Sequence, residues 1–478
     1  MIRVLSSEQM RESDNFTINT LNIPSSVLIE RAGNAVFEEI TKRFKGGRVL
    51  IVVGKGNNGN DGLEVARLLK TVHGFNVAVF KSYEPNFEIF NLKFDIIIDC
   101  LFGIGLSRNV DGENKKIIDL INESGCFIIS CDISSGLNAN NGLVMGSAVK
   151  AHMTIAIQEL KYGHLLNDGI DFSGDIIVKD VGIAVWEENF ASLITAEDVK
   201  PFFVKRKRNV NKGSFGKTAI IGGSKSFSGS SLLSINALTS LKMGVGYSYL
   251  FIPESLYDVY ACKNPECIVK TFKDYQGFYV FDEKDVVELL NFDSIALGMG
   301  MGVSEEVYKL ICYLLKNYEG NLLIDADGLN SLSKYGLKVL SDKSCEVVLS
   351  PHIGEFSRLI DVEKSLIINN PIEYCKNFSE KYKVITCLKS STTVISDGEK
   401  VIINTSGNNS LAKAGSGDVL AGVLSGLLTR DESLIDCVSV GAYIFGLSAD
   451  IAVKEQNEYT VTATDVVSAL PKAINSIL

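Results

Sequence analysis

The feature that most constrains the fold is an alternation that occurs twice along this chain of 478 residues. Short apolar runs alternate with stretches whose apolar residues recur at helical spacing, such as residues 61–70. This pattern is typical of βαβ units and of a doubly wound sheet. We therefore predict an α/β protein with two domains of three-layer α/β/α architecture, the first Rossmann-like. The buried strands expected in them are 48–54, 75–81, 94–100, 126–132 and 175–182, then 217–223, 247–253, 294–300, 321–328, 346–351, 384–389 and 401–407.

The rhythm breaks between residues 191 and 212, where PFFVKRKRNVNKG brings a basic cluster into an otherwise acidic chain. A solvated linker and a loop that faces an anion are both compatible with such a charge run. We place the two domains at residues 1–200 and 205–478.

Composition excludes several classes of protein. The formal net charge of -10, from 47 basic and 57 acidic residues, argues against a nucleic-acid partner. Ten cysteines without a CxxC pair and only four histidines disfavour a zinc site and a disulfide framework. The polar start MIRVLSSEQMRESD predicts no signal peptide, and no apolar run is expected to reach the ~18 residues that a membrane span needs. We expect a cytoplasmic protein without a membrane partner.

A glycine loop, GKGNNGNDG (54–62), follows the first strand. Its glycines fit the GxGxxG dinucleotide fingerprint, but the next strand ends at Lys81, where an acid for the ribose hydroxyls would be usual. A hydride-transferring Rossmann domain is therefore open but not favoured. The amides of Asn57, Asn58 and Asn60 can supply oxygen ligands to a hard cation, and with Asp61 they can equally cap a helix.

Two further aspartates end predicted strands: Asp99 before FGIGLSRN (102–109), and Asp132 in DISSG. Open α/β sheets bind ligands at the carboxyl ends of their strands. If the three strands are neighbours, Asp99 and Asp132 meet the amides of the glycine loop in one crevice. Taken singly, such aspartates are more often turn or cap residues.

The strongest signal in the second half is KAGSGDVLAGVLSGLL (413–428), in which Asp418 follows a glycine-serine-glycine turn and an apolar helix begins. Backbone N–H groups of such a turn form an anion hole, and an aspartate beside it suits a base that acts on a substrate hydroxyl. The alternative is that Asp418 merely caps the helix. Other small-residue turns and polar strand ends are SKSFSGSS (224–231), GMGMG (298–302), Asp325, Asp327, His352, Glu355 and Lys389. Asn211 in NKGSFGKT rules out a Walker A loop.

The amide-rich loop, the Asp99-to-GIGL segment and DISSG together resemble the NAD(P)H-hydrate epimerase family, the YjeF N-terminal domain. The resemblance implies that Asp132 and Lys161 transfer protons at the epimerising carbon, with a potassium ion near Asn58, Asp99 and Ser135. This chain departs from the family pattern at Asn60, Ser134 and Tyr162. The residues implied to bind the hydrated dinucleotide are Asn57, Asn58, Gly59, Asn60, Asp61, Gly103, Ile104, Gly105, Leu106, Ser107, Arg108, Asn109 and Asp132.

The second half resembles the ribokinase-like superfamily, and within it the ADP-dependent NAD(P)H-hydrate dehydratase domain. The resemblance implies that Asp418 activates the C6 hydroxyl of the hydrated ring for phosphorylation, with Mg²⁺ and ADP. Departures at Asn211, Ser230 and Ser390 leave the choice between ADP and ATP open. The implied contacts are Ser230, Gly300, His352 and Asp418 for the substrate, and Lys389, Ser390, Ser391, Thr392, Thr393 and Gly417 for the nucleotide.

The combined expectation is a bifunctional repair enzyme that epimerises hydrated NADH or NADPH and dehydrates the S epimer, with ADP converted to AMP and phosphate. Its partners would be small molecules, and we expect a homo-oligomer. One alternative is a small-molecule kinase with a non-catalytic dinucleotide-binding first domain. Another is a non-catalytic regulatory protein.

Overall fold

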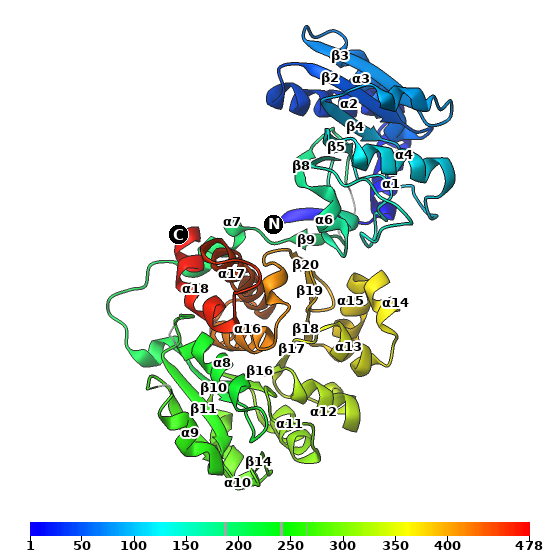
Figure 1. Cartoon of the computed structure of the whole chain (residues 1–478). Helices are drawn as coiled ribbons and strands as arrows, with labels where there is room; N and C mark the ends of the chain where they lie inside the picture. Colours follow the sequence, from blue (N-terminus) through cyan, green and yellow to red (C-terminus); the bar gives the residue numbers. More distant parts are fainter. Residues whose placement is uncertain (186–188, 240–241, 264) are drawn as a thin grey trace. The chain divides into compact units, whose positions relative to one another are not determined.

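A computed structural model describes residues 1–185, 189–239, 242–263 and 265–478 (Figure 1). The chain divides into two compact units. The first unit is Ile2–Ala191, and the second is Ser192–Leu478 together with Met1. The limits of the two functional domains, 1–200 and 205–478, stay a prediction.

The first unit is built on a six-stranded sheet with the order β3-β2-β4-β5-β6-β8. Every neighbouring pair in it is parallel. A further parallel pair joins β1 to β7. The strands are β1 (Ile2–Leu5), β2 (Gly47–Val53), β3 (Phe75–Lys81), β4 (Ile96–Cys100), β5 (Phe127–Cys131), β6 (Met153–Ile157), β7 (Leu160–Lys161) and β8 (Asp175–Lys179).

Helices cover both faces of this sheet. Apolar residues of α2 and α3 pack with one face of the strands, and those of α4 pack with the other. The predicted three-layer α/β/α architecture is therefore confirmed for the first unit. The helices are α1 (Ser7–Asn19), α2 (Ser25–Arg43), α3 (Asn57–Leu69), η1 (Phe87–Asn91), α4 (Gly112–Glu123), α5 (Tyr162–Leu165) and α6 (Gly169–Ser173).

One prediction in this unit is wrong in its details. The amide-rich segment after β2 was expected as a loop ahead of a helix at 61–70, but α3 already begins at Asn57. Gly59 makes this early start possible, because a Cβ at this position would lie 2.0 Å from the carbonyl oxygen of Gly54. The helix therefore starts tightly packed against the end of β2.

The second unit contains a larger sheet, whose strands run in the order β12-β11-β10-β15-β16-β17-β18-β19-β20. The pairs from β12 to β18 are parallel, and β19 pairs antiparallel with both of its neighbours. β13 and β14 form a separate hairpin. The strands are β10 (Lys217–Ile221), β11 (Tyr247–Pro253), β12 (Ile268–Phe272), β13 (Asp274–Tyr275), β14 (Phe278–Tyr279), β15 (Ser294–Leu297), β16 (Asn321–Ile324), β17 (Glu346–Leu349), β18 (Ile385–Leu388), β19 (Thr393–Ser396) and β20 (Val401–Asn404), with β9 (Ala191–Leu193) at the boundary between the units.

The helices of the second unit flank this sheet (Figure 1). Apolar side chains of α16, α17 and α18 form one large core cluster with the central strands. The helices are α7 (Ala196–Val199), η2 (Lys200–Phe203), η3 (Lys212–Phe215), α8 (Ser228–Thr239), η4 (Glu254–Leu256), α9 (Tyr257–Ala261), α10 (Glu283–Val286), η5 (Val287–Asn291), α11 (Glu305–Asn317), α12 (Asp327–Tyr335), η6 (Lys338–Ser341), α13 (Ile353–Ile360), α14 (Lys364–Asn369), α15 (Pro371–Tyr382), η7 (Asn409–Leu411), α16 (Ser416–Leu427), α17 (Leu434–Glu455) and α18 (Ala463–Ile477).

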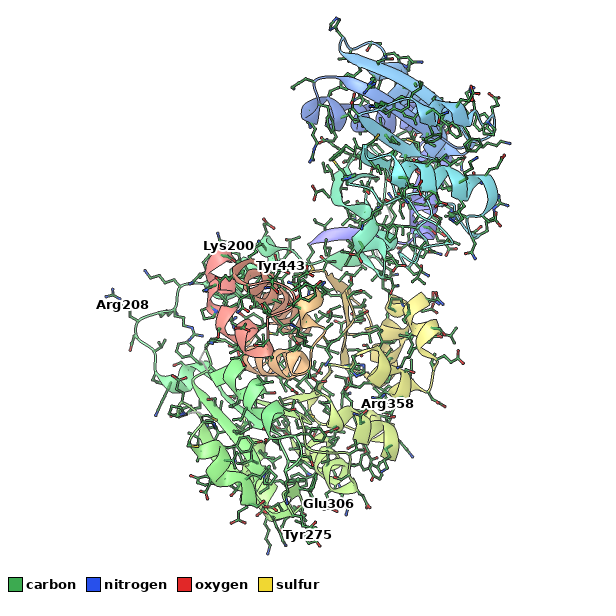
Figure 2. All side chains as sticks on the ribbon, viewed as in Figure 1. Lys200, Arg208, Tyr275, Glu306, Arg358 and Tyr443 are labelled. Atoms are coloured by element: carbon green, nitrogen blue, oxygen red, sulfur yellow. The ribbon has the colours of Figure 1, made fainter. Side chains whose placement is uncertain are left out.

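The segment around residue 200 divides into two parts. Val199 is fully buried in the core of the second unit, so residues up to Phe203 belong to that unit and are not a linker. The basic residues 204–211 are exposed, and Arg208 stands away from the ribbon (Figure 2). The solvated interpretation therefore fits these eight residues only.

The expectation that no segment is long and apolar enough for a membrane span is wrong by length and composition. Helix α17 has 22 residues, with a mean hydropathy of 1.5 in its most apolar window. However, 67% of that window is buried inside the unit, where it packs in the core cluster. Core helices of water-soluble domains can be equally long and apolar, and the burial of α17 makes it a core helix.

Candidate active sites

The polar strand ends of the first unit meet as the sequence predicts. β2, β4 and β5 are neighbours in the sheet, so the residues that follow them lie at one edge. Asn58 follows β2, Asp99 lies at the end of β4, and Asp132 follows β5. The three strand ends that the sequence places together are therefore neighbours in the fold.

Asp99 is fully buried and surrounded by donors. Its Oδ1 accepts from Ser135 Oγ at 2.6 Å and from the Leu101 N–H at 3.2 Å. Its Oδ2 accepts from Ser130 Oγ and from the Ser135 N–H, both at 2.9 Å. Burial raises the pKa of Asp99, and the Ser135 hydrogen bonds oppose that shift only in part. Asp99 thus ties the DISSG turn to the end of β4.

Beside this cluster, Asn58 has an unsatisfied oxygen. Its side chain is 8% exposed, and its Nδ2 donates to the Phe102 carbonyl at 2.8 Å. The amide oxygen Oδ1 is buried without a hydrogen-bond partner. A buried acceptor left without a donor costs free energy unless a cation or water satisfies it. A buried amide oxygen near a carboxylate, a hydroxyl and a carbonyl suits a hard cation.

Asp132 forms an ion pair with Lys161. Lys161 is fully buried, and its Nζ donates to Asp132 Oδ1 and to the Ile157 carbonyl at 2.7 Å. The same Oδ1 accepts from the Ile157 N–H at 3.1 Å. Asp132 has a φ of 66°, in the left-handed region that aspartate tolerates better than most residues. A strained backbone therefore holds a carboxylate against a buried ammonium group.

His164 contacts the backbone of both members of this pair. Its Nδ1 accepts from the Lys161 N–H at 3.0 Å, so the other ring nitrogen donates to the Asp132 carbonyl at 2.7 Å. Burial, reinforced by the charge of Lys161, lowers the pKa of His164 to about 4. The ring is therefore neutral near pH 7 and fixes the backbone of both partners. Spacing alone gave no signal for this residue.

Two more carboxylates face the Asp132–Lys161 pair. Burial raises the pKa of Asp14 to about 6, with a further increase from the charge of Asp132. Burial also raises the pKa of Asp61 well above its usual value, and Asp132 and Asp14 add to this shift. Asp61 does not cap α3, because it lies within the helix and the N-cap position is Gly56. Sequence reasoning missed Asp14, which lies forty residues before the start of the first motif at Gly54.

Helix α1 places Asp14 near Asp132 and Lys161. The Arg11 guanidinium donates to the Ile104 carbonyl at 3.3 Å, and the Tyr162 hydroxyl donates to Gln9 Oε1 at 3.5 Å. Both partners lie in segments assigned to the site from the sequence. Within the 103–109 loop, Ile104 is partly buried against two core clusters, while Gly105, Ser107, Arg108 and Asn109 are exposed.

The substitutions noted in this half leave the charged groups in place. Ser134 is buried, and its hydroxyl donates to the Phe172 carbonyl at 3.0 Å. Tyr162 starts the short helix α5 directly after Lys161. Asn57 and Asn60 are exposed at the start of α3, while Gly59 is buried.

In the second unit, Asp418 lies in the first turn of α16. The helix begins at Ser416, and its N-cap is Gly415, which has a φ of 92° and makes no side-chain capping bond. The alternative that Asp418 is only a cap residue is therefore wrong. Burial raises the pKa of Asp418 to about 6, and the negative charge of Asp325 adds to this shift. Ser230 opposes this rise in the pKa of Asp418 in part.

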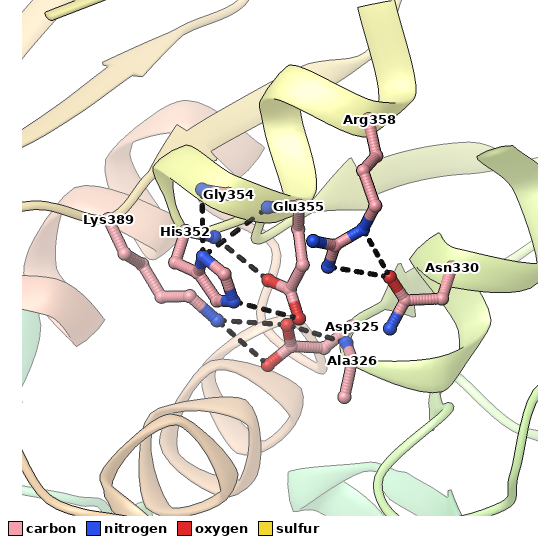
Figure 3. A network of polar contacts seen from close by, with 8 residues as sticks. All are labelled: Asp325, Ala326, Asn330, His352, Gly354, Glu355, Arg358 and Lys389. Carbon is pink, nitrogen blue, oxygen red and sulfur yellow. Dashed lines mark hydrogen bonds and ion pairs between the residues drawn. The ribbon is translucent and has the colours of Figure 1, made fainter. Parts of the chain in front are cut away.

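A buried ion pair lies close to this turn (Figure 3). Lys389 Nζ donates to both carboxylate oxygens of Asp325, at 2.9 and 3.1 Å. A Cβ at Gly417 would lie 3.5 Å from the same Nζ. Burial lowers the pKa of Lys389, but Asp325 and Glu355 outweigh it and raise the net value. A permanent positive charge therefore stands beside the N–H groups that open α16.

His352 and Glu355 close the other side of this network (Figure 3). His352 precedes α13, and its Nδ1 accepts from the Gly354 N–H at 2.9 Å, while Glu355 Oε2 accepts from the His352 N–H at 2.9 Å. Burial lowers the pKa of His352 and raises that of Glu355. The imidazole is 56% exposed, so it remains available to a ligand.

The remaining predicted contacts fall on loops around these groups. Gly300 has a φ of 67° and lies next to Ser230, since a Cβ there would be 3.1 Å from Ser230 Cβ. Ser390 and Ser391 are exposed after β18, Thr392 is buried, and Thr393 begins β19. The structure thus brings Asp418, Ser230 and Gly300 together, and Lys389 with Gly417. The assignment of the remaining residues to ligands stays a prediction.

Fold and geometry define a protein of two α/β units, each with a lysine–aspartate ion pair near the ends of its parallel strands. A family model described as NAD(P)H-hydrate dehydratase matches residues 218–472, and one described as YjeF-related protein N-terminus matches residues 25–89 and 81–163. The chain belongs to the family of bifunctional NAD(P)H-hydrate repair enzymes.

Similar proteins agree with this assignment along the whole chain. The bifunctional NAD(P)H-hydrate repair enzyme Nnr of Dictyoglomus turgidum is 31% identical, covering 100% of this chain and 99% of the relative. The enzyme of the same name from Archaeoglobus fulgidus is 32% identical over 94% of each chain. The crystal structure of the ADP/ATP-dependent NAD(P)H-hydrate dehydratase from Bacillus subtilis matches with a TM-score of 0.52 at 23% identity, over 60% of this chain and 99% of that chain. This likeness confirms the ribokinase-like fold of the second unit.

Proposed function

We propose that the first unit interconverts the R and S epimers of hydrated NADH or NADPH, and that the second unit dehydrates the S epimer at the expense of ADP. The observation that carries the proposal is that each unit holds its own buried lysine–aspartate ion pair where its parallel strands end. Two separate sites match two separate reactions on one damaged cofactor.

In the first unit, epimerisation requires the C6–O bond to open and water to add to the other face. One group must protonate the departing hydroxyl, and another must take a proton from the incoming water. Asp132 and Lys161 supply a carboxylate and an ammonium group in direct contact, so they can exchange these roles between the two directions. Asp14, with a pKa of about 6, is a third group able to hold a proton near neutrality.

The first site also suits a potassium ion. Its ligands would be the unpartnered Oδ1 of Asn58, the carboxylate of Asp99 and the hydroxyl of Ser135. When bound, the ion supplies positive charge for the phosphates of the dinucleotide. Replacing K⁺ by the larger tetramethylammonium ion should lower epimerisation but not dehydration, and Asn58→Ala should abolish this difference.

In the second unit, Asp418 takes the proton of the C6 hydroxyl, whose oxygen attacks the terminal phosphorus of ADP, and AMP leaves. The phosphate then leaves with the C6–O electrons, and loss of a proton from C5 restores the double bond. Lys389 neutralises the phosphate charge beside Gly417. The described residues contain no group of three or more His, Cys, Asp or Glu that could hold a metal, so Mg²⁺ would be held chiefly by the nucleotide phosphates.

A direct test follows the near-ultraviolet absorbance of the dihydronicotinamide ring after a mixture of both hydrated epimers meets the enzyme, Mg²⁺ and ADP. Full recovery, faster than the epimers interconvert unaided, supports both activities. Recovery that stops at the S fraction leaves only the dehydratase. No nucleotide-dependent recovery contradicts the proposal and favours the small-molecule kinase alternative, which the dehydratase family match does not support. Parallel reactions with ATP decide the nucleotide preference.

A further inference from the structure

The second unit exposes an unusual group of apolar side chains near its site. Among the phenylalanines that the structure describes, only Phe227 and Phe278 are exposed, at 54% and 41%. Tyr275 is 70% exposed and Val303 is 41% exposed. We call the three aromatic residues together with Val303 the aromatic ledge. Single exposed apolar residues are common, whereas a larger exposed apolar patch marks a surface that binds a ligand or a partner.

The ledge is continuous with the substrate side of the site. A Cβ at Gly300 would lie 2.8 Å from Phe227 Cβ and 3.1 Å from Ser230 Cβ. Two residues further, a Cβ at Gly302 would lie 3.6 Å from the ring of Phe278. Since Ser230 lies close enough to Asp418 to lower its pKa, a connected path leads from that carboxylate through Gly300 to both rings.

The hairpin that carries Phe278 is fixed in place. Tyr279 is 4% exposed and packs edge-on against Phe272, with 5.2 Å between ring centroids. The Gly277 N–H donates to Asp274 Oδ1 at 2.8 Å, and the Gly277 carbonyl accepts from the Lys225 N–H at 3.0 Å. Alternation along the strand therefore turns Phe278 outward when Tyr279 turns inward. Tyr275, labelled in Figure 2, pairs with Phe278 across the hairpin.

We propose that the aromatic ledge stacks on the purine ring of the hydrated dinucleotide while Asp418 acts on its other end. The proposal rests on the proposed dehydratase function. An adenine ring offers a flat π-face, and stacking on a preordered aromatic side chain costs little side-chain entropy. The ledge thus makes the site selective for a dinucleotide over its nicotinamide half.

The purine of the co-substrate ADP is a different candidate, and the sheet argues against it. The nucleotide is expected at Lys389–Thr393, which follow β18, whereas the ledge adjoins the loop that follows β15. In the sheet, β16 and β17 lie between those two strands. At ~4.8 Å per strand, the two loops start about 14 Å apart.

The experiment compares two substrates with the variants Phe278→Ala and Phe227→Ala. The substrates are the S epimer of hydrated NADH and the corresponding hydrated mononucleotide, which lacks the adenosine half. We expect KM for the dinucleotide to rise about tenfold in each variant with kcat unchanged, a loss typical of base–aromatic stacking. In both alanine variants, KM for the mononucleotide and KM for ADP should equal the wild-type values. A Phe278→Trp variant keeps an aromatic ring, so its KM for the dinucleotide should be close to that of the wild type.

Tyr335→Ala is the matched control, because Tyr335 is 37% exposed at the end of α12 and is not part of the ledge. It should leave every constant unchanged. Equal rises in KM for both substrates would show a structural effect, and a rise in KM for ADP would assign the ledge to the co-substrate; either result overturns the proposal, as does no change.

Calorimetric binding of NADH itself separates this inference from the proposed function. Binding about tenfold weaker in Phe278→Ala supports the ledge even if the wild type shows no turnover, and equal binding contradicts it. Absence of turnover in the wild type would contradict the proposed function alone.

Discussion

Both sites contain a buried lysine paired with an aspartate, yet the two pairs serve different purposes. In the first unit, the paired aspartate is itself the proposed reactive group, and the carboxyl groups of Asp14 and Asp61 face it. In the second unit, Asp325 pairs with Lys389, while the proposed base Asp418 lies in the first turn of a helix. A reversible proton exchange needs acid and base in contact, whereas phosphoryl transfer needs a fixed cation and a separate base.

The largest effect expected from this contrast follows Asp418→Asn. The variant keeps the hydrogen-bonding shape but cannot take the C6 proton, so dehydration should fall about 10⁴-fold, at the upper end for a general base. Epimerisation should be unchanged. Chromatographic separation of the epimers and absorbance recovery measure the two activities in one sample. A similar fall in epimerisation in the folded variant would contradict the separation of the sites.

Asp132→Asn should be milder, because other carboxyl groups lie close to Asp132. We expect epimerisation to fall about 10²-fold, the lower end for acid–base catalysis, since Asp14 can take over part of the proton transfer. Asparagine tolerates the φ of 66° and can still accept from the Ile157 N–H, so folding should be preserved. The double variant with Asp14→Asn should lose about a further tenfold. No additional loss would remove Asp14 from the account.

The pH profile tests how Asp418 is prepared. Burial raises its pKa to about 6, and the base works only when it is deprotonated. Dehydration should therefore fall about tenfold for each pH unit below about 6 and stay level above it. An aspartate with the ordinary value of 3.8 would keep full activity at pH 5, and that result would contradict the burial argument.

Asp325→Asn should have the smallest effect. It releases Lys389, so KM for ADP should rise about fivefold, comparable with the loss of one charge-assisted hydrogen bond. It also removes a negative charge that raises the pKa of Asp418, so the acid limb of the profile should move to lower pH. Asn330→Ala is a suitable control, since this residue contacts Arg358 rather than the ion pair. An unchanged acid limb would separate Asp325 from Asp418.

Much of the fold could be predicted from apolar runs, and the reason is burial on both faces. The runs at 75–81 and 247–253 coincide with β3 and β11. Strands with fewer apolar residues were missed, such as β12, whose IVKTF is partly exposed, and β19, whose pairing is antiparallel. The tertiary contact between Gly59 and Gly54 decided where α3 starts, and spacing does not reveal such a contact.

The candidate sites follow the same division. Groups at strand ends, such as Asp99, Asp132 and Lys389, could be found because the topology of a parallel sheet gathers strand ends at one edge. Asp14 could not be found, because it reaches the site from α1, which carries no recognisable motif. His164 lies only three residues after Lys161, but its spacing gave no sign that its ring bonds the backbone of both partners. The pairing of Lys389 with Asp325 also required the order of the sheet, which places β16 two strands from β18.

We propose that two independent sites act in sequence on one diffusible substrate. The most direct measurement supplies the pure R epimer of hydrated NADH, with ADP and Mg²⁺, to Asp132→Asn, to Asp418→Asn, and to an equal mixture of both. We expect that neither variant alone restores the absorbance faster than its own slow epimerisation or dehydration allows. The mixture should restore it faster than either variant alone. A mixture as inactive as its components, with both proteins folded, would contradict the account.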